Sequence, residues 1–447
     1  MLLAKIVSAI HCRPMPQTDP PLNPAAVLAL IFAGAMVLSL MVRFWLATRQ
    51  MRHVARHSDT VPAAFASTVS LESHRKAARY ALTNGSFGLW SMTFSAAVLV
   101  VWTLLGGLGW LNESLLDVVR PRFGDMAYQL ALLSSFMVIG SLLELPFDLY
   151  STFRIEQAFG FNRMTWKLYL ADAAKGMLLG ALIGLPLAAG MLWIMGSTGA
   201  LWWLWAWAAW VGFNLLAMVV YPTLIAPLFN TFKPLADDVL ESRVKALMTK
   251  CGFTAKGFFV MDGSRRSAHA NAYFTGFGAS KRVVFFDTLL AKLSPGEVEA
   301  VLAHELGHFK LKHIPKRLVS MFAISFAAFA TLGWLSGQTW FYSAFGVQPS
   351  MAASNDAVSL LLFMLIVPVF GFFVSPVLAG LSRSHEFEAD AYACSCADGS
   401  DLKSALLKLY EDNASTLTPD PLYARFYYSH PPAAERLAAM TSVARHT

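Results

Sequence analysis

Seven apolar stretches, each about 20 residues long, constrain the fold of this 447-residue chain more than any other feature. A helix of about that length crosses the hydrocarbon core of a bilayer, which is about 30 Å thick. The stretches lie at Ala25–Leu46, Phe87–Leu111, Ala127–Leu145, Gly176–Met195, Leu201–Tyr221, Leu318–Phe341 and Val358–Gly380. Charged residues make up 14% of the chain, whereas soluble domains carry about 25%. The sequence therefore predicts an all-α membrane protein that crosses the bilayer several times.

The distribution of lysine and arginine among the loops predicts the orientation of the chain. These residues concentrate in the loops after the first and third stretches, in segment 229–316 and after Gly380. The intervening loops are poor in them, and Gly196–Ala200 contains none. Because positively charged loops stay in the cytoplasm, segment 229–316 and the C-terminal segment 381–447 are expected to face the cytosol. The net charge of +7 has the same explanation, so no nucleic-acid partner is expected.

The stretches also divide the chain. Residues 1–24 are expected to form an irregular tail, 25–228 to hold the first five membrane helices, and 317–380 to hold the last two. Segment 229–316 is the polar insert that is large enough to fold as a domain. The four cysteines lack the spacing of a disulfide framework or of a cysteine zinc site.

Segment 229–316 contains patterns of helices and strands. Ser294, Pro295 and Glu297 form the pattern of a capped helix start, so a helix is expected from there to about Lys312. Pro315 is expected to end or kink it before the sixth stretch. The elements expected ahead of this helix are a helix at Asp237–Lys250 and strands at Gly257–Met261 and Arg282–Asp287.

The helix after Ser294 carries the pentapeptide His304-Glu305-Leu306-Gly307-His308. Residues i and i+4 lie on one helix face, so His304 and His308 can direct imidazole nitrogens at one metal ion. Glu305, beside the first histidine, is placed to take a proton from a water that the metal activates. A catalytic zinc site needs a third protein ligand and an open position for water.

Candidates for the third ligand follow the seventh stretch, where several acidic residues and one histidine cluster. On a helix, Glu386 and Asp390 share a face, so one carboxylate can bind zinc while the other accepts a hydrogen bond from a ligand histidine. Glu388 points to the opposite side of the same helix. The spacing leaves both Glu386 and His385 open as the third ligand.

The pentapeptide, together with Glu386-Phe387-Glu388-Ala389-Asp390, resembles the M48 family of integral-membrane zinc peptidases. Further segments are similar to the type I CaaX prenyl protease (Ste24) group of that family, and the resemblance extends from about Pro62 to Ala438. The segments that carry it are Asp262–Phe277, Phe153–Asn162 with Thr165, Ala226–Asn230, and Ser429–Pro432 with Glu435 and Arg436.

The resemblance implies a fold and a set of roles. The implied fold is seven helices around an intramembrane chamber, capped by a small α+β, gluzincin-like zinc domain. The resemblance implies that His304, His308 and Glu386 bind one zinc ion per chain and that Asp390 is the hydrogen-bond partner of a ligand histidine. It implies that Glu305 is the general base and later the acid, and that His430 stabilises the oxyanion. It also implies that Asn271 and Ala272 contact the substrate backbone.

Two further interpretations concern residues around this set. The strand Arg282–Asp287 is expected to offer an edge to which an extended substrate peptide adds. Arg383 and Arg436 are interpreted as structural ion-pair partners outside the core of the site.

These features predict a zinc endopeptidase of the membrane that cuts peptide bonds near the cytosolic face. In the eukaryotic group the implied substrates are prenylated CaaX proteins, whereas a bacterial enzyme would act on misfolded or short membrane-associated peptides. Ala444–Thr447 carries no dilysine-type retrieval signal, which with the short loops favours a bacterial inner membrane over the endoplasmic reticulum. The alternative is a protein that binds or transports a lipid or solute and has a structural zinc site. Glu305 argues against it, because a structural site needs no base.

Overall fold

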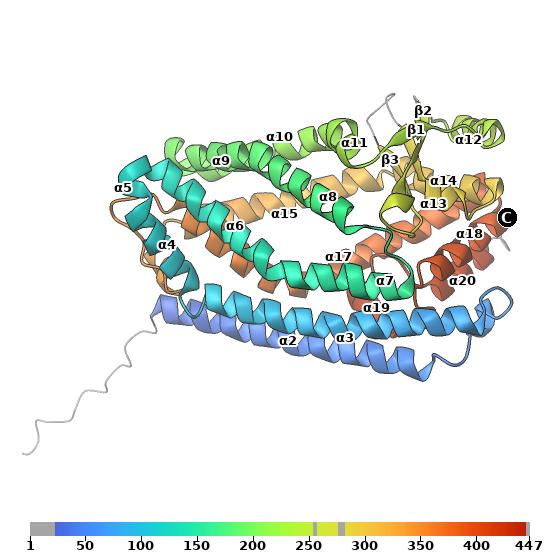
Figure 1. Cartoon of the computed structure of the whole chain (residues 1–447), viewed down its shortest axis with the longest axis horizontal. Helices are drawn as coiled ribbons and strands as arrows, with labels where there is room; N and C mark the ends of the chain where they lie inside the picture. The colour runs from blue at the N-terminus through green and yellow to red at the C-terminus, as the bar shows by residue number, and fades with distance from the viewer. Residues whose placement is uncertain (1–22, 254–256, 276–281, 444–447) are drawn as a thin grey trace, which may run out of the picture.

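The structure, a computed structural model, describes residues 23–253, 257–275 and 282–443. Nearly all of the expected tail at 1–24, the residues Ala444–Thr447 and the last two residues of Asp262–Phe277 lie outside this part. Seven long, apolar helices lie side by side, and a small domain with a β-sheet covers one end of them (Figure 1).

The seven candidate spans agree in number with the seven apolar stretches. π-helical turns join α6 to α7, α8 to α9 and α10 to α11, so each of these pairs forms one span. The helices of this part are α2 (Pro24–Arg56), α3 (Leu71–Trp102), α4 (Gly107–Val118), α5 (Arg120–Phe123), α6 (Asp125–Tyr150), α7 (Gln157–Phe159), α8 (Trp166–Leu179), α9 (Leu185–Ser197), α10 (Trp202–Val220), α11 (Ala226–Phe229), α15 (His313–Leu335), α16 (Thr339–Ser343) and α17 (Asp356–Cys396).

Most of the expected ends differ from those of the helices by several residues, and three of them show how the chain is arranged. The second stretch was expected to reach Leu111, but α3 ends at Trp102 and Gly106, with φ 76°, turns the chain into α4. The sixth stretch was expected to reach Phe341, whereas α15 ends at Leu335. The seventh differs most, because α17 continues for 41 residues to Cys396 and contains residue 380 in its interior. One helix therefore both spans the membrane and enters the small domain.

The small domain contains a four-stranded sheet in the order β1-β2-β4-β3. β2 and β4 are parallel, and β1 and β3 are antiparallel to their neighbours. The expected strands at Gly257–Met261 and at 282–287 are present, although the second ends at Phe286, where a helix begins. The elements are β1 (Phe232–Pro234), α12 (Asp238–Lys250), β2 (Gly257–Met261), β3 (Ala272–Thr275), β4 (Arg282–Phe286), α13 (Asp287–Leu290), α14 (Pro295–Lys310), α18 (Gly399–Asp412), α19 (Pro421–Tyr427) and α20 (Ala433–Val443).

The position of β4 overturns the expectation that it offers a free edge to substrate. It pairs with β2 on one side and β3 on the other, so its backbone hydrogen-bonding groups are already used. Within the described residues β3 pairs only with β4, and it is an edge strand of the sheet. Among the described residues, β1 is the other edge strand, so the capacity to pair with an extended peptide lies with β1 or with β3 and not with β4.

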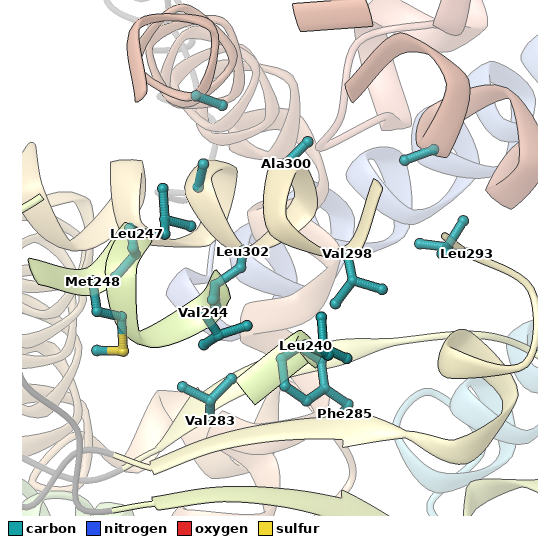
Figure 2. Packing of buried hydrophobic residues seen from close by; sticks show 14 of the residues in the cluster. Leu240, Val244, Leu247, Met248, Val283, Phe285, Leu293, Val298, Ala300 and Leu302 are labelled. Atoms are coloured by element: carbon teal, nitrogen blue, oxygen red, sulfur yellow. The ribbon is translucent and has the colours of Figure 1, made fainter. Parts of the chain in front are cut away.

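A continuous apolar core fixes α14 between the sheet and the other helices of the domain. Leu240 and Val244 of α12 and Val298 of α14 pack over Val283 and Phe285 of β4 (Figure 2). Burying each leucine or valine contributes about 1.5–3 kcal/mol. The core therefore fixes the position of α14, which carries the pentapeptide, relative to the sheet.

Candidate active site

The start of α14 is capped as its sequence predicts. Ser294 Oγ accepts a hydrogen bond from the backbone N–H of Glu297, and Glu297 Oε2 accepts one from the backbone N–H of Ser294. The helix ends at Lys310, and Lys312 turns the chain in the left-handed conformation, with φ 58°. Pro315, which was expected to end or kink this helix, lies instead in the first turn of α15.

Three of the predicted residues bring donor atoms to one point. The Nε2 atoms of His304 and His308 are 3.2 Å apart, and each lies 3.4 Å from a carboxylate oxygen of Glu386. One suitable atom from each residue falls within 4.8 Å of the others. Two imidazoles and a carboxylate form a donor set that suits zinc.

The carboxylate of Glu386 supports this fit. Its Oε2 is buried and makes no hydrogen bond within the described residues, although His430 Nδ1 lies 2.8 Å away in a geometry unsuited to one. A buried carboxylate oxygen that faces two imidazoles and has no donor is well placed to bind a cation. The other candidate, His385, stacks instead on the ring of His313 at a centroid distance of 4.1 Å. The structure thus groups Glu386, and not His385, with the two histidines.

Asp390 lies behind His304, as the shared helix face predicts. Its Oδ1 accepts a hydrogen bond from His304 Nδ1 at 2.8 Å, which leaves the Nε2 lone pair of His304 directed at the site. Arg436 donates to both oxygens of Asp390 at 2.6 and 2.8 Å. Arg436 was expected to form an ion pair outside the site. The ion pair exists, but it is buried within the site, 3.4 Å from His304 Nδ1.

The charges around the two histidines favour a cation between them. Burial lowers the pKa of His304, but the hydrogen bond to Asp390 and the nearby carboxylate of Glu386 outweigh this effect and raise it to about 9. Burial and the neighbouring charge of His304 lower the pKa of His308 to about 4. The two carboxylates beside His304 thus favour a positive charge at this point, which a bound metal ion would supply.

Glu305 faces the same small space. A cavity of about 140 Å³ is bounded by Glu305, His304, Glu386, His430 and the Asn271-Ala272 pair, with further residues of α14 and α18. Burial raises the pKa of the Glu305 carboxyl above its ordinary value. A raised pKa makes a carboxylate a stronger base, which suits a group that takes up a proton and returns it.

His430 and Asn271 reach the cavity from different loops. His430 contacts Glu386 through Nδ1, while 64% of its side chain remains exposed. Asn271 precedes the edge strand β3, and its Oδ1 accepts a hydrogen bond from the backbone N–H of Ala272 at 2.8 Å. Its backbone carbonyl accepts another from Phe286 N at 3.0 Å. These bonds fix the start of β3 beside the site.

A larger cavity adjoins this space. It measures about 750 Å³, lies between α2, α3 and the C-terminal helices, and shares His430 and Arg436 with the smaller cavity. Its wall includes Met51, Leu89 and Met92. The cavity therefore extends from the candidate site toward the membrane-spanning helices α2 and α3.

Two residues at the site escaped the reasoning from sequence. His313 Nδ1 lies 2.9 Å from His308 Nδ1, and His313 Nε2 lies 3.0 Å from Glu388 Oε2. Helical spacing could not predict the contact between His313 and His308, because α14 ends before α15 begins. Glu388 does point away from Glu386, as expected, but it meets α15 there. An unexplained histidine so close to the pentapeptide was the available signal.

Comparisons with known proteins identify the family of this chain. Residues 50–231 match the family described as CAAX prenyl protease N-terminal, five membrane helices, and residues 234–444 match peptidase family M48. The CAAX prenyl protease 1 homolog of Arabidopsis thaliana is 34% identical over 419 residues, which cover 91% of this chain and 96% of the relative. CAAX prenyl protease 1 of Saccharomyces cerevisiae is 33% identical, with 93% and 95% covered.

A solved structure extends the agreement to the fold. The crystal structure of S. mikatae Ste24p superposes with a TM-score of 0.86 at 31% identity, covering 94% of this chain and 100% of that one. The fold, the grouping of metal-binding side chains and the similarity along nearly the whole chain thus lead to one conclusion. This chain is an integral-membrane metallopeptidase of family M48 and belongs to its CAAX prenyl protease 1 (Ste24) group.

Proposed function

We propose that this protein is a zinc endopeptidase that cleaves membrane-associated peptides near the cytosolic face of its membrane. The observation that carries the proposal is the position of Glu305 in the cavity that His304 and Glu386 also line. Zinc bound by His304, His308 and Glu386 would supply Lewis acidity, polarising the scissile carbonyl and acidifying water. A site with a purely structural role has no need of a buried carboxyl beside the metal ligands.

The residues around the metal ligands divide the remaining work. Glu305 takes a proton from the attacking water and returns it to the leaving amine. His430, whose ring is mostly exposed beside Glu386, donates a hydrogen bond to the oxyanion of the tetrahedral intermediate. Asp390 holds His304 in the tautomer that presents Nε2.

The substrate backbone is proposed to pair with β3. Ala272 begins this edge strand and lines the cavity with Glu305, so an extended peptide added to β3 would pass the ligand group. The adjoining cavity, with its methionine and leucine side chains, suits an apolar substituent on the substrate. The named relatives are CAAX prenyl proteases, and a prenylated C-terminal peptide is the substrate class that combines both features.

The decisive test measures cleavage of a farnesylated CaaX peptide and of the same peptide without the lipid. The purified wild-type protein is expected to bind one zinc ion and to cut the farnesylated peptide. Glu305→Gln is expected to keep the metal and lose at least about 100-fold in kcat, the scale of general-base catalysis. A wild-type protein that binds zinc but cuts neither peptide would overturn the proposal and favour a binding or transport role.

Two further variants test single assignments. Glu386→Ala should lose stoichiometric zinc, and its retention would remove Glu386 from the ligand set. His430→Phe should keep zinc but lower kcat with little change in KM, because the oxyanion exists only in the reaction intermediate. Wild-type kcat in this variant would remove the oxyanion role of His430.

A further inference from the structure

The side of the His308 ring that faces away from the metal site contacts residues to which the proposed mechanism gives no role. Its Nδ1 lies 2.9 Å from His313 Nδ1, on the side of the ring away from the metal-facing Nε2. The other nitrogen of His313, Nε2, lies 3.0 Å from Glu388 Oε2. A continuous chain of three side chains therefore runs from the metal site to Glu388.

Local backbone geometry builds this chain. Lys312 takes the left-handed conformation, which is uncommon for a residue with a side chain, and separates α14 from α15. His313 thereby becomes the first residue of α15 and returns toward His308. The His313 ring is 4% exposed and stacks on His385 of α17 at an interplanar angle of 13°. The ring is therefore held by packing, independently of its hydrogen bonds.

One assignment of the ring protons lets both hydrogen bonds between these three side chains form while His308 keeps a free lone pair for the metal. An ionised carboxylate only accepts, so Glu388 requires the proton of His313 to be on Nε2. The Nδ1 of neutral His313 then carries a lone pair and accepts from His308 Nδ1–H. His308 in that tautomer has its own lone pair on Nε2, which faces His304 Nε2 and Glu386.

From this geometry we infer that Glu388 and His313 form a relay that fixes the ligand tautomer and ring orientation of His308. The inference rests on the metal site proposed above and assigns both relay members as positioning residues. Asp390 orients His304 directly, because its Oδ1 accepts a hydrogen bond from His304 Nδ1 at 2.8 Å. The two ligand histidines thus differ, since one is oriented by a carboxylate and the other through a second imidazole.

The position of Glu388 also explains why His313 is needed to connect it to His308. Asp390 lies on the face of α17 that carries Glu386, whereas Glu388 lies on the opposite side, where α15 begins. The chain joins α14, α15 and α17 by side-chain contacts. His308 is therefore oriented by the same packing that brings the sixth span against the seventh.

Zinc affinity, measured by competition with a chelator in the full-length protein in detergent, tests the relay. His313→Leu is expected to weaken zinc binding by about 10–100-fold, the usual effect of losing the hydrogen-bond partner of a ligand histidine. It should also alter the visible absorption spectrum of the cobalt(II)-substituted protein. His313→Asn should recover most of the affinity, because its amide oxygen can accept the proton of His308 Nδ1.

Glu388→Ala provides a second test at the outer end of the relay, where the side chain is 49% exposed and its loss does not open the core. It should weaken zinc binding less than His313→Leu does. The double variant His313→Leu/Glu388→Ala should match His313→Leu alone, since Glu388 acts through His313. Glu299→Ala is the matched control: it removes a partly exposed carboxylate of α14 that pairs with Arg243 of α12, and it should leave the zinc affinity unchanged.

Wild-type zinc affinity in Glu388→Ala, or in a folded His313→Leu, would overturn the relay, as would additive losses in the double variant. If His313→Leu does not fold, Glu388→Ala decides the question alone. These measurements require no cleavage. An inactive wild-type protein that binds zinc would contradict the proposed function, while the relay would stand or fall on the variants.

Discussion

At the scale of single residues, the site depends on buried charges that find partners in distant parts of the chain. Asp390 is 2% exposed and is satisfied by His304 and by two hydrogen bonds from Arg436. Removing one partner of a buried ion pair leaves the other charge without compensation. Arg436 is therefore needed for the folded state as well as for the orientation of His304.

Arg436→Leu is predicted to lower the free energy of unfolding by about 3–5 kcal/mol, because it leaves the Asp390 carboxylate buried and unpaired. Denaturation in detergent micelles measures the change. Arg243→Leu, which removes a more exposed pair with Glu299, should cost less than about 1 kcal/mol. The double variant Asp390→Leu/Arg436→Leu should be more stable than Arg436→Leu alone, and the reverse order would contradict this account.

At the scale of elements, the site is the contact between α14 and α17. The pentapeptide glycine, Gly307, allows this contact, because a Cβ atom there would lie 3.0 Å from Ala389 Cα and 3.2 Å from Ala389 O. His304 and His308 lie on one side of the contact and Glu386 on the other. The spacing of the two helices therefore sets the spacing of the metal-binding atoms.

Gly307→Ala is predicted to push α14 away from α17, to cost about 1–3 kcal/mol of stability, and to weaken zinc binding. Thermal denaturation and chelator competition measure the two effects. Ala389→Gly should not rescue the variant, since the clash is with the main chain. Gly140→Ala, on α6 where a Cβ meets nothing within 4 Å, should be neutral or stabilising. Equal behaviour of the two alanine variants would refute the close-contact argument.

The capped start of α14 makes the stability of the domain depend on pH. Burial raises the pKa of Glu297, but hydrogen bonds to Lys408, Ser404 and the Ser294 backbone outweigh this effect and bring it below its ordinary value of 4.5. A lowered pKa in the folded state stabilises the protein above that ordinary value. The contribution is lost as the pH falls through the folded-state pKa.

Glu297→Gln is accordingly predicted to be less stable than wild type at pH 6–7 by about 1.5–3 kcal/mol, the scale of hydrogen bonds to a charged group. The difference should shrink progressively as the pH falls below about 4.5. Urea denaturation at several pH values measures it. A difference that is constant across this range would show that the charge of Glu297 contributes nothing.

At the scale of the whole molecule, α17 connects the membrane-spanning helices to the candidate active site. It runs without interruption from Asp356 to Cys396, with Glu386 and Asp390 in its final third. The small domain and the ends of the spans therefore form one structure (Figure 1). Because the positive loops cluster at the end that carries this domain, the site is expected on the cytosolic side.

Labelling with a membrane-impermeant maleimide tests this orientation in sealed vesicles of known sidedness, with the four native cysteines replaced by alanine. Lys245→Cys, on α12 of the small domain, should react only when the cytosolic face is accessible. Asp117→Cys, on α4 at the opposite end, should react only from the other face. The reversed pattern would place the active site outside the cytosol.

The sequence by itself determined the elements and the main residues of the site, because those features are encoded over short distances. Apolar length defined seven spans, the Ser294–Glu297 pattern defined the start of α14, and the one-turn spacing of His304 and His308 defined a shared face. Each depends on residues within a few turns of one another, where helix geometry alone relates position to direction.

Only the tertiary structure decided which distant residues complete the site. It brought Arg436 into the site, connected His313 to Glu388 across 75 residues, and made β3 rather than β4 an edge strand. These outcomes follow from how α14, α15 and α17 pack and from the strand order of the sheet. Neither has a local signal in the sequence, because side-chain contacts between elements depend on relative positions that helical or strand periodicity does not encode.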